Sequence, residues 1–257
     1  MTIYMQNATR PLKEAPISEA ERKARVELAA AYRIFDMLGW SLLIFNHITL
    51  RVAGPEPRFL INPFGLHYSE ITASSLLLVD LEGNVLRESR WPMNRAGFVI
   101  HSALHESQPE AHCIMHTHTT TGMAVACLKD GLSPHNFYGA MLQGQVAYHD
   151  FEGITVEPGE KERLVRDIGD KRAVILRNHG LLAWGPSVSQ AFLTLWTLQQ
   201  ACDVQIAAAS AGAIHPVTPQ AIAISVRESG QGEKRTCEDV FVALRRKLDS
   251  IDPSYRE

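Results

Sequence analysis

The chain has 257 residues, 46% of them apolar and 21% charged, and 25 basic against 28 acidic residues give a formal net charge of −3. These values are typical of a globular protein and argue against binding of nucleic acid or an anionic membrane as its main role. The length is sufficient for a core that needs no disulfide or structural metal. Four scattered cysteines form no CxxC pair, so we expect reduced thiols and a cytoplasmic protein.

The first seventeen residues lack the apolar core and basic flank of a secretory signal, and no run approaches the roughly 20 apolar residues of a membrane span. A helix follows, because Ser18 and Glu21 form a capping box and apolar residues then recur at helical spacing up to Gly39. Apolar runs separated by turn residues next predict strands at 41–52, 59–62 and 76–80. Their short connections favour antiparallel pairing.

The second half of the chain alternates helices and strands. Helices are expected at 96–107, 119–128, 187–210 and 236–248, and strands at 113–117, 173–176 and 181–184. No repeat or linker divides the chain. We therefore predict an α/β fold of three layers, in which helices flank a central, mainly antiparallel sheet.

Histidine is unusually dense in one region. Seven of the 11 histidines fall between 101 and 149, where an even spread would place about two. Residues two apart on a strand point to the same face, so His116 and His118 can hold one ion. His179 follows the aliphatic strand 173–176, where functional groups are often presented. Three imidazoles with open coordination positions describe a catalytic site of the zinc type.

Each of these histidines also has a structural interpretation. An H-x-H pair can be two residues of a strand face, and His179 can be a hydrogen-bonded turn residue. His101 and His105 share a helix face and form a second candidate pair. Their apolar neighbours favour a role near the core instead.

An ordered set of motifs resembles the class II aldolase/adducin family between about Glu21 and Gly212. The set comprises the opening helix, Asn46, the run Ile61-Asn62-Pro63-Phe64-Gly65-Leu66, the Pro109-Glu110 turn, His116-Thr117-His118 and Asn178-His179-Gly180-Leu181. The resemblance implies a family domain over 18–212, preceded by an extension at 1–17. A helical segment at 213–257 would follow and pack on the same domain or on a neighbouring subunit.

In aldolases of this family the three histidines hold a divalent metal, usually zinc, which stabilises an enediolate during carbon–carbon bond chemistry. The resemblance therefore implies His116, His118 and His179 as ligands of zinc, with manganese, iron, nickel or cobalt as alternatives. It also implies a small-molecule substrate and a homotetramer with sites near subunit interfaces. Substrate contacts would fall at Asn46, Asn62, Gly65 and Arg95, and Tyr138 lies in the loop where these aldolases place a catalytic tyrosine.

The sequence departs from the sugar-phosphate aldolases before helix 96–107. Their proton-moving glutamate aligns with Gly97, and two serines that help bind phosphate align with Arg95 and Ala96. The segment 94–98 instead resembles adducin heads. A decarboxylase needs no base before the carbon–carbon bond breaks, and Gly97 would leave a roomier pocket. Arg95 could then pair with a substrate carboxylate, or be a solvated surface charge.

Two functions follow from this resemblance. The first is a divalent-metal-dependent lyase that performs aldol cleavage or decarboxylation of a small oxygenated metabolite. If the reaction is an aldol cleavage, Tyr138 is our candidate for the replacement acid, ahead of Asp150 and Glu106. The second is a non-catalytic binding or scaffold protein of the adducin-head type, which explains the missing glutamate. Three converging imidazoles favour the enzyme.

Overall fold

A computed structural model describes residues 16–153, 159–229 and 233–257. The first helix, α1 (Glu19–Met37), begins as predicted, because the Ser18 hydroxyl accepts the Glu21 N–H at 3.1 Å. The Glu21 side chain does not complete the capping box. Its carboxylate instead accepts bonds from Arg25 and Arg87, at 2.8 Å each. Most of the predicted extension at 1–17 lies outside the described residues.

Seven strands form one sheet in the order β3-β2-β1-β4-β7-β6-β5. The strands are β1 (His47–Val52), β2 (Arg58–Ile61), β3 (Leu77–Val79), β4 (Cys113–Thr117), β5 (Val146–His149), β6 (Ala173–Leu176) and β7 (Gly180–Gly185). All neighbours pair antiparallel except β5 and β6, which are parallel. The predicted, mainly antiparallel sheet is therefore confirmed, with one parallel pair at its edge.

The strand predicted at 41–52 is shorter than expected. Residues 41–46 form turns and irregular chain, and β1 begins at His47. Leu43 adopts a φ of 50°, which a strand residue cannot have, and the Asn46 amide donates to the Trp40 carbonyl at 2.8 Å. Apolar composition alone therefore overestimated the length of the strand, and Asn46 precedes β1 instead of lying within it.

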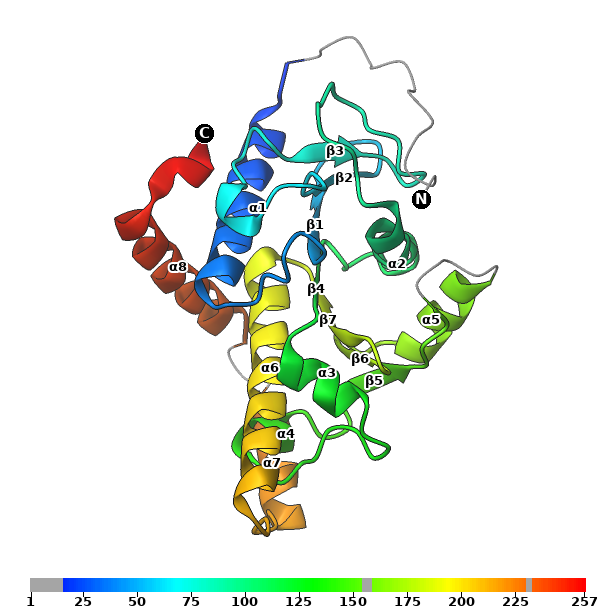
Figure 1. Ribbon diagram of the computed structural model, residues 1–257, viewed down its shortest axis with the longest axis vertical. Helices are drawn as coiled ribbons and strands as arrows, with labels where there is room; N and C mark the ends of the chain where they lie inside the picture. The colour runs from blue at the N-terminus through cyan, green and yellow to red at the C-terminus, as the bar shows by residue number, and fades with distance from the viewer. Residues whose placement is uncertain (1–15, 154–158, 230–232) are drawn as a thin grey trace.

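Helices cover both faces of the sheet (Figure 1). The helices α1, α6 (Val188–Ala211) and α8 (Glu233–Ile251) lie on one side, and α2 (Arg95–Ser107) and α5 (Glu160–Ile168) lie on the other. The remaining helices are α3 (Thr120–Ala126), α4 (Phe137–Met141), α7 (Pro219–Ser229) and the short η1 (Tyr68–Glu70) and η2 (Pro253–Arg256). The predicted three-layer fold is confirmed. None of the described helices has the length and hydropathy of a membrane span.

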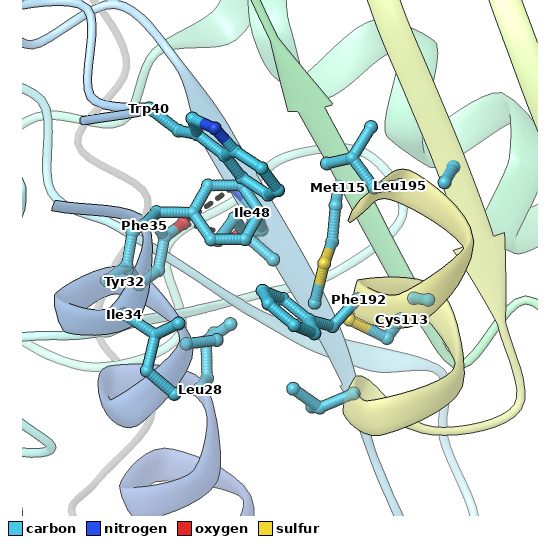
Figure 2. Packing of buried hydrophobic residues seen from close by; sticks show 14 of the residues in the cluster. Leu28, Tyr32, Ile34, Phe35, Trp40, Ile48, Cys113, Met115, Phe192 and Leu195 are labelled. Carbon is cyan, nitrogen blue, oxygen red and sulfur yellow. Dashed lines mark hydrogen bonds between the residues drawn. The ribbon is translucent and has the colours of Figure 1, made fainter. Parts of the chain in front are cut away.

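The larger core lies between the sheet and α1 and α6. Phe35, Trp40 and Phe192 pack their rings within 5.2–6.2 Å of one another, and Met115 reaches them from β4 (Figure 2). The Tyr32 hydroxyl enters this core and accepts the Ile48 N–H at 2.8 Å. A second core lies under α2 and α5 and contains Ile114, Leu182 and Trp184, among others. Alternation along β4 thus sends Met115 to the first core and leaves its even-numbered residues facing α2 and α5.

Candidate metal centre

His116 is the buried member of the histidine cluster. It lies in β4 on the face towards α2 and α5, and its side chain is 1% exposed. Its Nδ1 lies 2.8 Å from the Leu181 carbonyl oxygen, which can only accept a hydrogen bond. Nδ1 therefore carries the proton, and Nε2 is left with a free lone pair. Such backbone support is typical of metal-ligating histidines.

His118 and His179 complete the cluster from two chain turns. His118 follows the last residue of β4, and its Nε2 lies 2.6 Å from Nε2 of His116. His179 lies in the turn between β6 and β7, after Asn178, which adopts a left-handed φ of 56°. Candidate ligand atoms of the three histidines lie within 4.8 Å of one another. The structure therefore brings together the three residues that the sequence nominated as metal ligands.

Gly180 permits this close approach. A Cβ atom at this position would overlap the Thr117 carbonyl oxygen and would lie 3.0 Å from Cδ2 of His118. Any larger residue would push the start of β7 away from the end of β4. Gly180 is thus part of the site, although it has no functional group.

Burial keeps the three imidazoles neutral. It is the main cause that lowers the pKa of His116 well below its ordinary value, and the neighbouring histidines add to the effect. Burial likewise lowers the pKa of His118, and it lowers the pKa of His179 to about 4, with help from His118 and His149. Neutral imidazole is the form that binds metals. The donor set therefore fits a divalent ion of the zinc type.

A cavity of about 470 Å³ opens at this cluster. Its walls come from the start of β1, the N-terminal part of α2, the end of β4, the chain after β5 and the turn that carries His179. Apolar side chains such as Phe45, Phe64 and Phe151 form much of the wall. The space is sufficient for a small metabolite beside the three histidines.

The space next to Gly97 is filled, which corrects our prediction of a roomier pocket. A Cβ atom on residue 97 would overlap Cδ2 and Nε2 of His47. The imidazole of His47 is 4% exposed and lines the cavity together with Gly97. Its ring centroid lies 5.2 Å from that of His116. A histidine from β1 thus occupies the position to which the alignment assigns a glutamate.

His101 and His105 belong to a buried hydrogen-bonded chain instead of a second metal site. Nε2 of His101 lies 3.0 Å from Nδ1 of His47, and its Nδ1 lies 2.7 Å from the hydroxyl of Thr49. The same hydroxyl lies 2.8 Å from Nε2 of His105, whose Nδ1 lies 2.7 Å from the Ala111 carbonyl oxygen. Both histidines are therefore satisfied in the interior, as their apolar neighbours suggested.

The predicted substrate contacts Asn46 and Asn62 are buried and bonded within the chain. Asn62 places its Oδ1 2.9 Å from the Tyr32 hydroxyl, to which its own N–H donates at 3.1 Å. Asn46 donates to Trp40, and its Oδ1 is buried without a hydrogen-bond partner in the described part of the chain. Neither residue is among those that line the cavity.

Gly65 and Tyr138, two further predicted residues, lie outside the cavity wall, and the side chain of a third, Arg95, is not described. Gly65 lies against Trp91, outside the cavity wall. Tyr138 lies on α4 and packs its ring 5.5 Å from that of Trp196 on α6, and it too is absent from the wall. Arg95 is the first residue of α2, but its side chain lies outside the described part. The described cavity wall therefore contains the three histidines but neither Gly65 nor Tyr138.

Sequence reasoning missed two cavity residues, His47 and His149. His149 is the last residue of β5 and lines the cavity. Its Nδ1 lies 2.8 Å from Oδ2 of Asp167. It was noted only as a member of the dense region. His47 lies outside that region. The alternation of His47 and Thr49 with apolar residues indicated a polar strand face and was the available signal.

The fold agrees with comparisons to known proteins. A family model, the Class II Aldolase and Adducin N-terminal domain, matches residues 26–206. The chain belongs to this family. It resembles an aldolase II superfamily protein from Pseudomonas syringae of known crystal structure, at 42% identity and a TM-score of 0.91, over 94% of this chain and 98% of the other.

Two other relatives are an aldolase and an adducin. L-fuculose 1-phosphate aldolase from Glaciozyma antarctica is 30% identical, with a TM-score of 0.81 over 96% of this chain and 97% of that chain. Alpha-adducin of Rattus norvegicus is 46% identical over 198 residues, which are 76% of this chain and 27% of the adducin. The relatives of this chain therefore include both an aldolase and an adducin.

Proposed function

We propose that this protein is a divalent-metal-dependent lyase that acts on a small oxygenated metabolite. The observation that carries the proposal is the convergence of three neutral imidazoles, His116, His118 and His179, at the base of a cavity. Burying three such rings together has a desolvation cost, and a shared cation would repay it by giving each nitrogen a partner. The similarity to L-fuculose 1-phosphate aldolase supports a lyase.

The three histidines would hold one ion, and zinc is our first choice because the donor set consists only of nitrogen. When bound, such an ion supplies Lewis acidity that stabilises the negative charge of an enolate. The protein contributes orientation. The Leu181 carbonyl fixes His116, and the left-handed turn at Asn178 presents His179.

The reaction is either an aldol cleavage or a decarboxylation. An aldol cleavage requires a group that moves a proton, and the glutamate position holds Gly97. Decarboxylation yields an enolate directly when carbon dioxide leaves, so it requires no earlier proton removal. We propose Tyr138 as the acid for an aldol reaction. Because Tyr138 does not line the cavity of its own chain, that role requires a neighbouring subunit to supply it, as in the homotetramer that we propose.

The experiment has two steps. Metal content is measured on protein purified without a histidine tag, and we expect one zinc, manganese, iron, nickel or cobalt ion per chain. Metal-loaded protein is then incubated with a panel of keto acids and ketose phosphates, because decarboxylation releases carbon dioxide and aldol cleavage releases an aldehyde. Substoichiometric metal that added salts do not restore would contradict the proposal.

The alternative is a non-catalytic binding protein. The 46% identity to alpha-adducin and the glycine at position 97 favour it. It predicts a protein that tolerates loss of the three histidines without loss of its binding function. Stoichiometric metal without turnover of any substrate in the panel would support this alternative.

A further inference from the structure

A chain of four hydrogen bonds runs from a backbone carbonyl beneath α2 to the cavity. It links the Ala111 carbonyl oxygen, His105, Thr49, His101 and His47 over distances of 2.7, 2.8, 2.7 and 3.0 Å. All three histidines and the threonine are buried, with 0–4% of each residue exposed. The chain therefore lies in the interior, and its cavity end is the ring of His47.

The donor and acceptor of every hydrogen bond in the chain follow from the end at the Ala111 carbonyl oxygen. The Ala111 oxygen can only accept, so Nδ1 of His105 donates to it, and Nε2 of a neutral His105 must then accept. The single hydroxyl proton of Thr49 goes to that Nε2. The Thr49 oxygen consequently accepts from Nδ1 of His101.

The last bond is fixed in the same way. With its proton on Nδ1, a neutral His101 can only accept at Nε2, so Nδ1 of His47 donates to it. The free nitrogen of His47 is then Nε2, the atom beside Gly97. Residues in the described part of the chain make no hydrogen bond to it.

Neutrality of the three rings has a physical cause. Burial lowers the pKa of His47 and of His101 well below the ordinary value, and nearby histidines lower each further. Burial also lowers the pKa of His105 to about 3, although the bond to Ala111 opposes it. The printed hydrogen-bond partners of the three rings include no carboxylate, so a positive charge on any of these rings would be buried without a counter-charge.

From this geometry we infer that His47 presents an unprotonated Nε2 to the cavity and accepts a hydrogen bond from a hydroxyl group of the substrate. His101, Thr49 and His105 are positioning residues, because they act through His47. The inference rests on the proposed function and narrows its substrate class to hydroxylated compounds. Ketones, carboxylates and fully ionised phosphates have no proton to donate to this nitrogen.

Nitrogen NMR of protein labelled with ¹⁵N-histidine tests the tautomer without requiring turnover. The His47 resonances are assigned from their absence in His47→Gln. We expect a protonated Nδ1 and an unprotonated Nε2. The near-isosteric Thr49→Val variant removes the hydroxyl that fixes the chain, so we expect a mixture of tautomers or a protonated Nε2 at His47.

The matched control for Thr49→Val is Thr117→Val. Thr117 is buried on the neighbouring strand β4, and its hydroxyl has no hydrogen-bond partner in the described residues. Thr117→Val should leave the His47 resonances unchanged. A protonated Nε2 in the parent protein, or a His47 spectrum that does not respond to Thr49→Val, would overturn the inference.

The hydroxyl contact is tested with glycolate on the zinc-loaded protein, and acetate is the probe that lacks a hydroxyl. We expect glycolate to shift the His47 Nε2 resonance in a saturable manner and acetate to leave it in place. Absence of a saturable glycolate shift overturns the inference. Failure of metal binding would overturn the proposed function instead, and would leave the tautomer result standing.

Discussion

The imidazole of His47 fills the space into which a side chain on residue 97 would project, so that Gly97 and His47 can only occupy their positions together. His47 is fixed by its hydrogen bond to His101, and it cannot move aside without breaking the buried chain. The absence of a side chain at residue 97 is therefore a packing requirement of this protein.

Gly97→Ala tests that requirement. Overpacking a buried position costs about 1–3 kcal/mol, so we expect the free energy of unfolding to fall by this amount in urea titrations. Gly54→Ala is the matched control, because a Cβ atom there would meet nothing within 4 Å. Equal stabilities of the two variants would show that His47 adjusts freely.

Loss of one imidazole should abolish metal binding. In His116→Ala two ligands remain, and two histidines bind zinc far more weakly than three. We expect less than one tenth of the parent metal content after dialysis, measured by elemental analysis. His215→Ala, which alters an exposed histidine, should retain full content. Retention of metal in His116→Ala would show that our ligand assignment is wrong.

The proximity of His116 and His118 could be predicted from local sequence because strand periodicity is a local property. His116 and His118 are two residues apart around the end of a short apolar strand, and His179 follows another strand. Their convergence depends on the pairing of β4 with β7, which is a tertiary property. The family resemblance implied that the three histidines meet, but it gave no strand pairing. The fold layers followed from helical and strand periods in the same way.

The role of His47 could not be predicted from those patterns. It reaches Gly97 because β1 pairs with β4 in a register that places His47 opposite His116, and register is a tertiary property. The same limit applies to the segment 41–46. Its apolar residues are typical of a strand. The left-handed φ of Leu43 and the hydrogen bond from the Asn46 side-chain amide to the Trp40 carbonyl instead hold this segment outside the strand.

Glu21 should be important for stability. Burial alone would raise the pKa of its carboxyl group, but hydrogen bonds from Arg87 and Arg25 outweigh this effect and hold the pKa below its ordinary value. Glu21→Gln leaves the buried Arg25 guanidinium without its counter-charge. We expect a loss of about 3 kcal/mol, at the low end for a broken buried ion pair, because Arg25 keeps its bonds to the Ala73 and Leu76 carbonyls.

Chemical denaturation at pH 7 measures this loss. The exposed Glu19 in the same helical turn provides the control, and Glu19→Gln should cost less than about 1 kcal/mol. The contribution of Glu21 is present above the unfolded carboxyl pKa and disappears as the pH falls through the lower, folded value. A Glu21→Gln protein as stable as Glu19→Gln would contradict a structural role for the ion pair.

Acid should destabilise the protein through His105. An unfolded histidine titrates near pH 6.5, whereas burial lowers the folded pKa of His105 to about 3. Between these values the unfolded state binds more protons, so stability is fully present above about pH 6.5 and declines as the pH falls towards 3. This one group accounts for about 2 kcal/mol between pH 7.5 and pH 5.

Urea titrations at both pH values, with a chelator present to exclude metal linkage, measure the decline. His105→Gln should reduce the pH-dependent loss by about 2 kcal/mol whatever its effect on absolute stability, because glutamine does not titrate. His215→Gln changes an exposed histidine and should preserve the parent slope. If His105→Gln and the parent lost the same stability between pH 7.5 and pH 5, His105 would not be the buried neutral group that the structure describes.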